Sequence, residues 1–284
     1  MKWGVIRFPG SLDDLDAMYG LRDVMGQHVT ALWHKDESLQ GAECIVLPGG
    51  FSYGDHLRCG AIARFSPIMK SVAKFAADGG LVIGICNGFQ ILTEAHLLPG
   101  ALTRNRTLSF ICDRVHLRVE NSKTPFSCTM RAGDILALPI KHGEGCYVAP
   151  EKELLQMEER GQVILRYVDA KGDVTDAANR NGSMRSIAGI ANERFNVFGL
   201  MPHPEHGVEA ALFGADGRKI FESIIGFEMQ LRSAMKRGQS FSSANVSEMV
   251  LVSTKGKSKE QIVAEATSGA RKLGILKDDG AEKP

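Results

Sequence analysis

A cysteine between two glycines is the first feature of the sequence that could do chemistry. Cys86 follows the apolar run LVIGI and precedes Asn87, where a helical pattern begins. Gly84 and Gly88 lack the Cβ atoms that would crowd a sharp turn, so the thiol can project from a strand-to-helix elbow. The free N–H groups and the dipole of the following helix favour a thiolate there. The spacing predicts a nucleophile, and a small buried cysteine beside flexible glycines is the alternative.

A second reactive group lies in the string MPHPEH, residues 201–206. Its two prolines favour extended backbone, in which residues two apart point to the same side. His203 and Glu205 are therefore aligned for the carboxylate to fix the imidazole tautomer and stabilise its protonated form. Metal ligation by His203 and His206 is the alternative. The prolines disfavour the helical face that this spacing needs and no third ligand is evident, so we expect no metal.

Paired glycines follow another apolar run, in the string IVLPGGFSYGD, residues 45–55. A glycine can turn its peptide N–H toward a developing negative charge without the strain that a side chain would cause. The main-chain N–H groups of Gly50 and Asn87 are therefore candidates for an oxyanion hole. A plain turn is the commoner use of Pro-Gly-Gly, so this assignment depends on the cysteine.

The cysteine motif and the Pro-Gly-Gly motif each lie where a strand pattern ends. Strands are expected at 3–8, 28–33, 43–47 and 81–85, and helices at 12–25, 61–77 and 88–96. Such alternation predicts an α/β fold with a mostly parallel central sheet flanked by helices on both faces.

The pattern changes after about residue 108. Short β-rich pieces at 115–119, 135–140, 163–168 and 186–190 predict a smaller antiparallel layer. A helical pattern returns at 216–236, and a stretch rich in Ser, Gly and Asn follows it. We therefore expect one domain over residues 1–238, and a linker with a C-terminal appendage of open role over residues 239–284.

The amino-acid composition limits the classes of protein and of partner that fit this chain. The 284 residues, 44% of them hydrophobic, suffice for a globular core. Lys and Arg (34) nearly balance Asp and Glu (33), which argues against nucleic acid or a membrane surface as partner. No segment nears the roughly 18 apolar residues of a membrane span. Six scattered cysteines without a C-x-x-C pair, and no recognisable secretory signal, predict a cytoplasmic protein.

Taken together, the strings LPGGFSYGDHLRCGAIARF, GICNGFQIL, HGEG and MPHPEH resemble those of class I glutamine amidotransferases. Within this class, the chain most resembles the glutaminase subunits of phosphoribosylformylglycinamidine synthases, to which the string PGGFSYGD is highly specific. The resemblance extends from about residue 2 to residue 231. It implies a flavodoxin-like sheet with the nucleophile at a strand-to-helix elbow. It also implies an enzyme that releases ammonia from glutamine for purine biosynthesis.

The resemblance assigns roles to individual residues. Cys86 is implied as the nucleophile, His203 as acid and base, and Glu205 as the partner that orients His203. Gln90, at the family's C-x-G-x-Q position, is implied to contact the glutamine side chain. Weaker candidates for substrate binding are in the HGEG loop, where related enzymes hold the amino acid end of glutamine: His142, Gly143 and Glu144.

The family mechanism is attack of the Cys86 thiolate on the glutamine side-chain carbonyl, release of ammonia with a proton from His203, and hydrolysis of the thioester. The ammonia would pass to a large synthetase subunit, which uses ATP and Mg²⁺ to convert formylglycinamide ribonucleotide to its amidine. A small accessory subunit would complete the complex. The chain has no G-x-x-x-x-G-K-[ST] loop, so we expect it to bind no cofactor itself.

Two places depart from the family pattern. Leu12-Asp13-Asp14 stands where Asn-Cys-Asp is usual, and His206 stands where Arg is common. Neither departure is expected to touch the catalytic residues. The alternatives that stay open are a γ-glutamyl hydrolase or an intracellular cysteine peptidase on the same elbow, and a regulatory subunit without catalysis.

Overall fold

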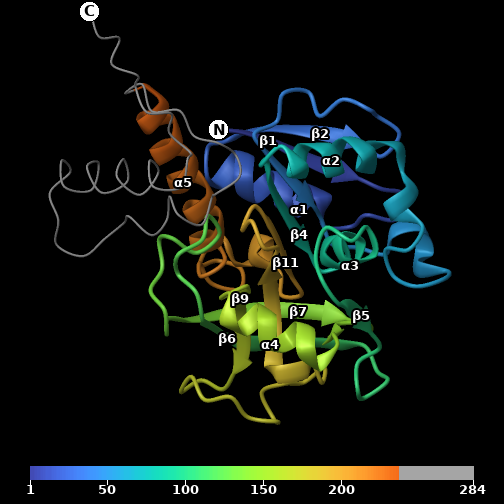
Figure 1. Ribbon diagram of the computed structural model, residues 1–284, viewed down its shortest axis with the longest axis vertical. Coiled ribbons are helices and arrows are strands. Elements are labelled where there is room, and N and C mark those ends of the chain that lie inside the picture. The colour runs from blue at the N-terminus through green and yellow to red at the C-terminus, as the bar shows by residue number, and fades with distance from the viewer. Residues whose placement is uncertain (237–284) are drawn as a thin grey trace, which may run out of the picture.

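A nine-stranded sheet crosses the part of the protein that the computed structural model describes, residues 1–236 (Figure 1). Its strands lie in the order β2-β1-β3-β4-β11-β10-β9-β6-β7. Neighbours from β2 to β11 pair in parallel, and neighbours from β11 to β7 pair antiparallel. The expected fold class is confirmed. Most of the antiparallel strands continue the large sheet, and β5 and β8 form a separate antiparallel pair.

The strands are β1 (Lys2–Arg7), β2 (His28–Trp33), β3 (Cys44–Leu47), β4 (Leu81–Ile85), β5 (Ala101–Thr103), β6 (Ile111–Val119), β7 (Ile135–His142), β8 (Cys146–Val148), β9 (Val163–Val168), β10 (Ile187–Ala191) and β11 (Val197–Leu200). The helices are α1 (Asp14–Tyr19), α2 (Pro67–Ala77), α3 (Asn87–Glu94), α4 (Glu151–Glu159) and α5 (Arg218–Lys236). A π-helical turn, Gly20–Val24, continues α1, and short 3-10 turns lie at Ser52–Asp55, Ala63–Phe65, Met184–Ser186 and Pro204–Gly207.

Strands β2 and β4 have the predicted bounds, whereas two predicted helices are shorter than expected. The helix expected over 12–25 is divided between α1 and the π-helical turn. The helix expected over 61–77 begins only at Pro67, because proline disfavours helical backbone in the residue before it. Neither β11 nor α4 was predicted: β11 has only four residues, and α4 buries only Leu154 and Met157.

Helix α3 packs close to the sheet because two paired positions lack side chains. Gly84 of β4 and Gly199 of β11 are register partners. A Cβ at Gly84 would lie 2.5 Å from Leu92 Cδ1, and one at Gly199 would lie 2.1 Å from Phe89 Cδ2. The two glycines thus let α3, and the turn before it, lie directly on the ends of these strands.

The opposite face of the sheet carries large rings. Trp3 of β1 meets Phe221 of α5 edge to face, with ring centroids 6.1 Å apart. Phe198 of β11 stacks on Phe126 at 5.0 Å. All four rings are buried, and each such side chain contributes on the order of 2–3 kcal/mol relative to an exposed one. The parallel strands are therefore held between two apolar layers, which makes their ends a rigid base for a site.

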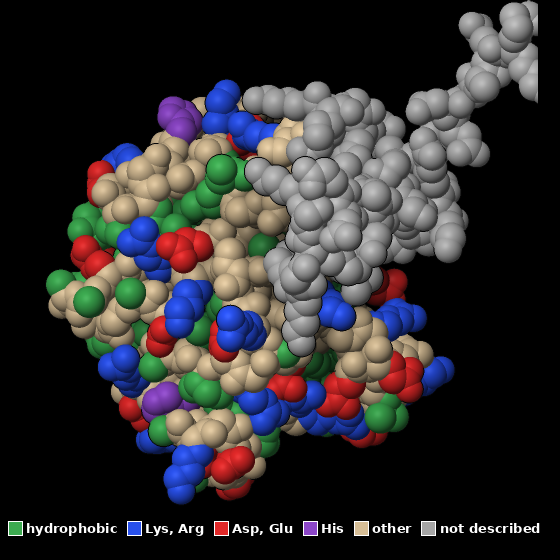
Figure 2. Space-filling model, turned by 90° about the vertical axis from the view of Figure 1, so that its left-hand side faces the viewer, with side chains coloured by type: hydrophobic (Ala, Val, Ile, Leu, Met, Phe, Trp, Pro, Cys, Tyr) green, Lys and Arg blue, Asp and Glu red, His purple; other side chains and the backbone are tan. Residues whose placement is uncertain are grey.

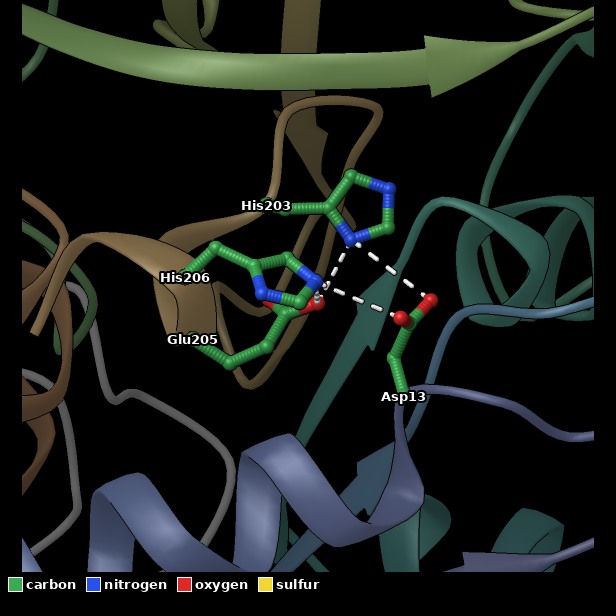
Figure 3. A group of neighbouring side chains, drawn as sticks. All are labelled: Asp13, His203, Glu205 and His206. Atoms are coloured by element: carbon green, nitrogen blue, oxygen red, sulfur yellow. Dashed lines mark hydrogen bonds and ion pairs between the residues drawn. The ribbon is translucent and has the colours of Figure 1, made fainter. Parts of the chain in front are cut away.

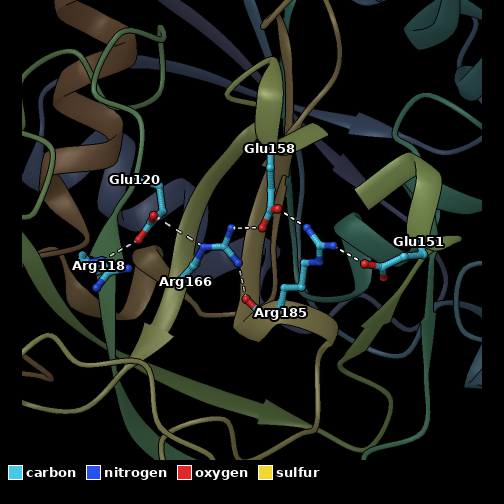
Figure 4. Close-up of polar contacts among 6 residues, drawn as sticks. All are labelled: Arg118, Glu120, Glu151, Glu158, Arg166 and Arg185. Atoms are coloured by element: carbon cyan, nitrogen blue, oxygen red, sulfur yellow. Dashed lines mark hydrogen bonds and ion pairs between the residues drawn. The ribbon is translucent and has the colours of Figure 1, made fainter. Parts of the chain in front are cut away.

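Charged side chains connect α4 to the antiparallel half of the sheet (Figure 4). Arg166 of β9 pairs with Glu158 of α4 at 2.5 Å and with Glu120, beyond β6, at 3.6 Å. Arg185 contacts both Glu158 and Glu151. Because Arg166 is largely buried and the pairs share partners, this network holds α4 more firmly than isolated surface pairs would.

The surface carries mixed charge. On the described part of the face drawn in Figure 2, basic and acidic side chains are interspersed. Within residues 1–236, no helix combines the length and the apolar character that crossing a bilayer requires. The domain boundary expected at residue 238 and the appendage expected over residues 239–284 lie outside the described residues.

Candidate active site

The predicted catalytic residues meet at the carboxyl ends of the parallel strands. Cys86 follows β4, Gly50 lies just beyond β3, and His203 lies just beyond β11. Parallel strands end at the same edge of a sheet, so residues from distant parts of the sequence become neighbours there. The loop between β1 and α1 brings a fourth residue, Asp13, to this edge.

Cys86 occupies a strained turn between β4 and α3. Its φ and ψ angles are 51° and −104°, a conformation that side chains rarely adopt. A Cβ at Gly88 would lie 1.9 Å from the carbonyl oxygen of Leu47, and one at Gly84 would lie 2.6 Å from the carbonyl oxygen of Gly88. Both flanking glycines are therefore required, as the sequence predicted. Cys86 is 5% exposed and occupies the position directly before the first turn of α3.

His203 is held by Glu205 (Figure 3). Its Nδ1 donates a hydrogen bond of 2.5 Å to Glu205 Oε1, and both side chains are buried. Burial alone would lower the pKa of His203, but the nearby charges of Glu205 and Cys86 raise this pKa well above its usual value. Its Nε2 points away from Glu205 and has no hydrogen-bond partner among the described residues. This nitrogen is therefore available to a thiol, a substrate or a water molecule.

Two main-chain N–H groups are free beside the elbow. Gly50 has a φ of 142°, and a Cβ there would lie 2.6 Å from the carbonyl oxygen of Gly10. Neither the Gly50 nor the Asn87 N–H donates a hydrogen bond within the described part of the chain. The Asn87 side-chain oxygen accepts a hydrogen bond of 3.1 Å from the Ser52 N–H, which joins the two loops. Both N–H groups are thus free for the predicted oxyanion hole, and that role stays a prediction.

Gln90 links α3 to the HGEG loop. Its Nε2 donates to the carbonyl oxygen of Glu144 at 2.6 Å, and its Oε1 accepts from Asn87 Nδ2 at 2.9 Å. Both ends of the amide are thus used within the protein, so Gln90 supports the loop. Its contact with the glutamine side chain stays a prediction.

The HGEG loop is organised by a residue that the sequence did not reveal, Asn105. The Asn105 side chain accepts a hydrogen bond from Gly145 N–H at 3.0 Å and donates one to the carbonyl oxygen of His142 at 2.8 Å. Burial, with the nearby charge of His203, lowers the pKa of His142 to about 3, so this ring is neutral. Gly143 is open, since a Cβ there would meet only Phe110, at 3.8 Å.

Buried polar atoms without hydrogen-bond partners gather around these residues. They include His142 Nε2, His203 Nε2, Glu205 Oε2, Ser52 Oγ and Asp55 Oδ1. Buried polar groups are normally hydrogen-bonded, so these atoms are open to a ligand or to a water molecule. Ser52 and Asp55 were not predicted, although both lie in the string PGGFSYGD that marked this loop.

The departures from the family pattern reach the catalytic residues, so the expectation that they would not is wrong. Asp13 Oδ2 lies 3.8 Å from His203 Nδ1, and His206 Nε2 lies 3.7 Å from Glu205 Oε1 (Figure 3). The sequence could not show this, because the contact depends on β1 and β11 ending at the same edge. Leu12, by contrast, is exposed.

Four side chains at this edge also have the composition of a metal site: Asp13, His203, Glu205 and His206. One possible ligand atom from each lies within 4.8 Å of the others. Two ligands of one tetrahedral zinc ion lie roughly 3.3 Å apart, given bonds of about 2.0–2.1 Å. The 2.5 Å separation of His203 Nδ1 and Glu205 Oε1 is too short for both to bind one ion. The Lys141 ammonium against Asp13 further disfavours a cation. The arrangement fits a shared proton better than a metal.

Comparison with known proteins identifies the family. Residues 2–216 match the model of the CobB/CobQ-like glutamine amidotransferase domain. The phosphoribosylformylglycinamidine synthase subunit PurQ of Gloeobacter violaceus is 53% identical over 225 residues, which cover 79% of this chain and 97% of that protein. The protein of the same name from Moorella thermoacetica is 56% identical over 225 residues, 79% of this chain and 95% of the relative. The chain belongs to the PurQ family.

As a PurQ-family member, the chain is a glutamine amidotransferase, and a solved structure agrees. In the structure of PurLQS from Thermotoga maritima, one chain is 43% identical to this one. Its TM-score is 0.71, and the match covers 80% of this chain and 98% of that one. The match therefore spans nearly the whole of the Thermotoga maritima chain.

Proposed function

We propose that this chain releases ammonia from glutamine at Cys86 and supplies it to a phosphoribosylformylglycinamidine synthase. The observation that carries the proposal is the position of His203. Its Nδ1 is bonded to Glu205, its Nε2 is free, and Cys86 lies near enough to raise its pKa. A thiol, an imidazole and an orienting carboxylate in this order form a nucleophilic triad.

The first half of the reaction forms a thioester. The Cys86 sulfur attacks the side-chain carbonyl carbon of glutamine, and the negative charge that develops on oxygen is held by the N–H groups of Gly50 and Asn87. A single donor of this kind contributes on the order of 10²–10³-fold in rate. The C–N bond then breaks as the His203 imidazolium gives its Nε2 proton to the departing nitrogen, which leaves as ammonia.

The second half returns the enzyme to its starting state. His203, now neutral, takes a proton from water through Nε2, and the hydroxide that forms attacks the γ-glutamyl thioester. The C–S bond breaks and glutamate leaves. Glu205 keeps Nδ1 as the protonated nitrogen in both halves, so Nε2 can alternate between acid and base.

Substrate binding involves the loop that Asn105 and Gln90 hold in place. Gly143, Glu144 and His142 contact the amino acid end of glutamine, and Gln90 contacts its side chain. The main support is that Gly143 is open and that His142 Nε2 is buried without a partner.

The ammonia passes to a synthetase partner within a complex. The Thermotoga maritima relative was solved as PurLQS, and we extend that assembly, with a large synthetase and a small accessory subunit, to this chain. The synthetase subunit uses ATP and Mg²⁺, and this chain binds no cofactor of its own. We expect the complex to act in the cytoplasm.

The test compares two nitrogen sources in the reconstituted complex. Cys86→Ala is expected to abolish synthesis of the amidine from glutamine and to leave synthesis from ammonium salts intact. Cys112→Ala, which alters an exposed cysteine of β6, is the matched control and is expected to retain both activities. Equal loss of both activities in Cys86→Ala would contradict the proposal, as would glutamine-dependent synthesis that persists without Cys86.

A further inference from the structure

Two residues that depart from the family pattern, Asp13 and His206, contact each other. Asp13 and His206 are 193 positions apart, yet His206 Nε2 donates to Asp13 Oδ1 at 3.2 Å. A carboxylate at the start of α1 and an imidazole after β11 therefore form a pair at the positions where the resemblance led us to expect Cys and Arg. The pair lies against the catalytic imidazole, with the ring centroids of His203 and His206 5.3 Å apart.

The carboxylate of this pair also faces the catalytic imidazole. Asp13 Oδ2 is 3.8 Å from His203 Nδ1, and Asp13 Oδ1 is paired with the Lys141 ammonium (Figure 3). Gly49 makes the approach possible, since a Cβ there would lie 2.3 Å from Asp13 Oδ2 and 2.8 Å from His203 Cε1. Asp13 is 3% exposed, so its charge acts on His203 with little screening by water.

We propose that Asp13 is a second positioning carboxylate for His203, additional to Glu205, and that His206 and Lys141 hold it in place. This inference rests on the proposed function, in which His203 carries the proton that releases ammonia. Asp13 does not touch the reacting atoms. It acts through His203 by keeping the imidazole protonated to higher pH than Glu205 alone would.

Charged and titratable groups face His203 from every element around it. Glu205 and His206 come from the 3-10 turn after β11, and Asp13 from the start of α1. Cys86 comes from the elbow, and His142 from the end of β7. Burial raises the pKa of Asp13. The contacts of Asp13 with His206, His203 and Lys141 outweigh burial and bring this pKa far below its usual value. Asp13 is therefore an anion at every pH where the enzyme works, while the buried His142 is neutral.

The charges of Asp13 and Lys141 determine the direction in which the pKa of His203 shifts. A proton on His203 is stabilised by the Asp13 anion and destabilised by the Lys141 cation that is paired with Asp13. Removing the Asp13 charge lowers the pKa of His203, and removing the Lys141 charge raises it. Since ammonia leaves with the proton of His203, the alkaline limit of glutamine hydrolysis moves in the same direction as this pKa.

The experiment measures the His203 imidazole by NMR titration in the full chain labelled with ¹⁵N-histidine. Asp13→Asn is expected to lower the pKa of His203 by about one unit, because Lys141 offsets most of the Asp13 charge. Lys141→Met is expected to raise it. Asp14→Asn is the matched control, since Asp14 is an equally buried neighbour that pairs with Arg7 and not with a histidine. The pH profile of kcat/KM for glutamine in the complex should shift with each titration.

Shifts of opposite sign in the two variants separate a charge effect from simple loss of structure, and Lys141→Met keeps the test open if Asp13→Asn does not fold. An unchanged His203 titration in both variants would overturn the inference. The NMR measurement needs no catalysis, so its failure is distinct from failure of the proposed function, which the Cys86→Ala comparison reports.

Discussion

Glu205 decides which nitrogen of His203 carries the proton when the ring is neutral. Because Glu205 Oε1 accepts from Nδ1, the lone pair of Nε2 is left for the thiol or for water. Sequence reasoning could single out Cys86 and Gly50 because each lies in a short string where a strand pattern ends, and His203 and Glu205 because flanking prolines align residues two apart. It could not assign a role to Asp13, because that role arises from contacts between chain segments that are distant in sequence.

Glu205→Gln is expected to lower kcat for glutamine hydrolysis on the order of 10³–10⁴-fold. The amide can present its N–H group to Nδ1 and so favour the wrong tautomer. Steady-state glutaminase assays of the complex measure the loss, with synthesis from ammonium salts as the internal control. Glu222→Gln, an exposed change on α5, should leave both rates as they are. A loss below tenfold in Glu205→Gln would mean that the carboxylate does not orient the histidine.

At the scale of elements, the site depends on how closely α3 approaches β3, β4 and β11. The alternation of strands and helices, and the glycines that permit this approach, could be predicted from sequence. Strand β11 could not, because four residues of Val, Phe, Gly and Leu are too few for a periodic pattern. Helix α4 was missed because it is mainly polar and is held by the charged network that the sequence does not reveal.

Gly88→Ala tests the close approach. Its Cβ would meet the backbone of β3, which cannot move aside as a flexible side chain could. The free energy of unfolding should fall by about 3 kcal/mol or more. Gly226→Ala is the matched control: it lies within α5, where a Cβ has room, and should raise stability by about 0.5–1 kcal/mol. Urea unfolding of both variants measures this, and equal stability of Gly88→Ala and the parent would refute the close contact.

At the scale of the whole molecule, folding and the protonation of His203 are coupled. The pKa of His203 is raised in the folded state by Glu205 and Cys86, although burial opposes them. The stabilisation from its bound proton is therefore complete below its unfolded pKa of about 6.5 and is lost as pH rises through the raised folded value. Folded protein should hold this proton at a pH where the unfolded chain has released it.

The difference in unfolding free energy between the parent and His203→Gln should consequently fall by about 1 kcal/mol from pH 7 to pH 8. Taking the difference removes the contributions of the other histidines to the pH dependence of stability. The measurement stops at pH 8 because the raised pKa values of the buried thiols also lower the stability as pH rises further. Denaturant unfolding at both pH values measures it. A difference that stays constant or grows with pH would show that the folded state does not raise the pKa of His203.

The central claim, that Cys86 is the nucleophile of a glutaminase, is tested most directly by covalent trapping. The full chain is treated with an electrophilic diazo-ketone analogue of glutamine, digested and mapped by mass spectrometry. We predict one adduct, on the peptide that contains Cys86, and its suppression by excess glutamine. An adduct on another cysteine with Cys86 unmodified, or no adduct under conditions where glutamine is hydrolysed, would contradict the account.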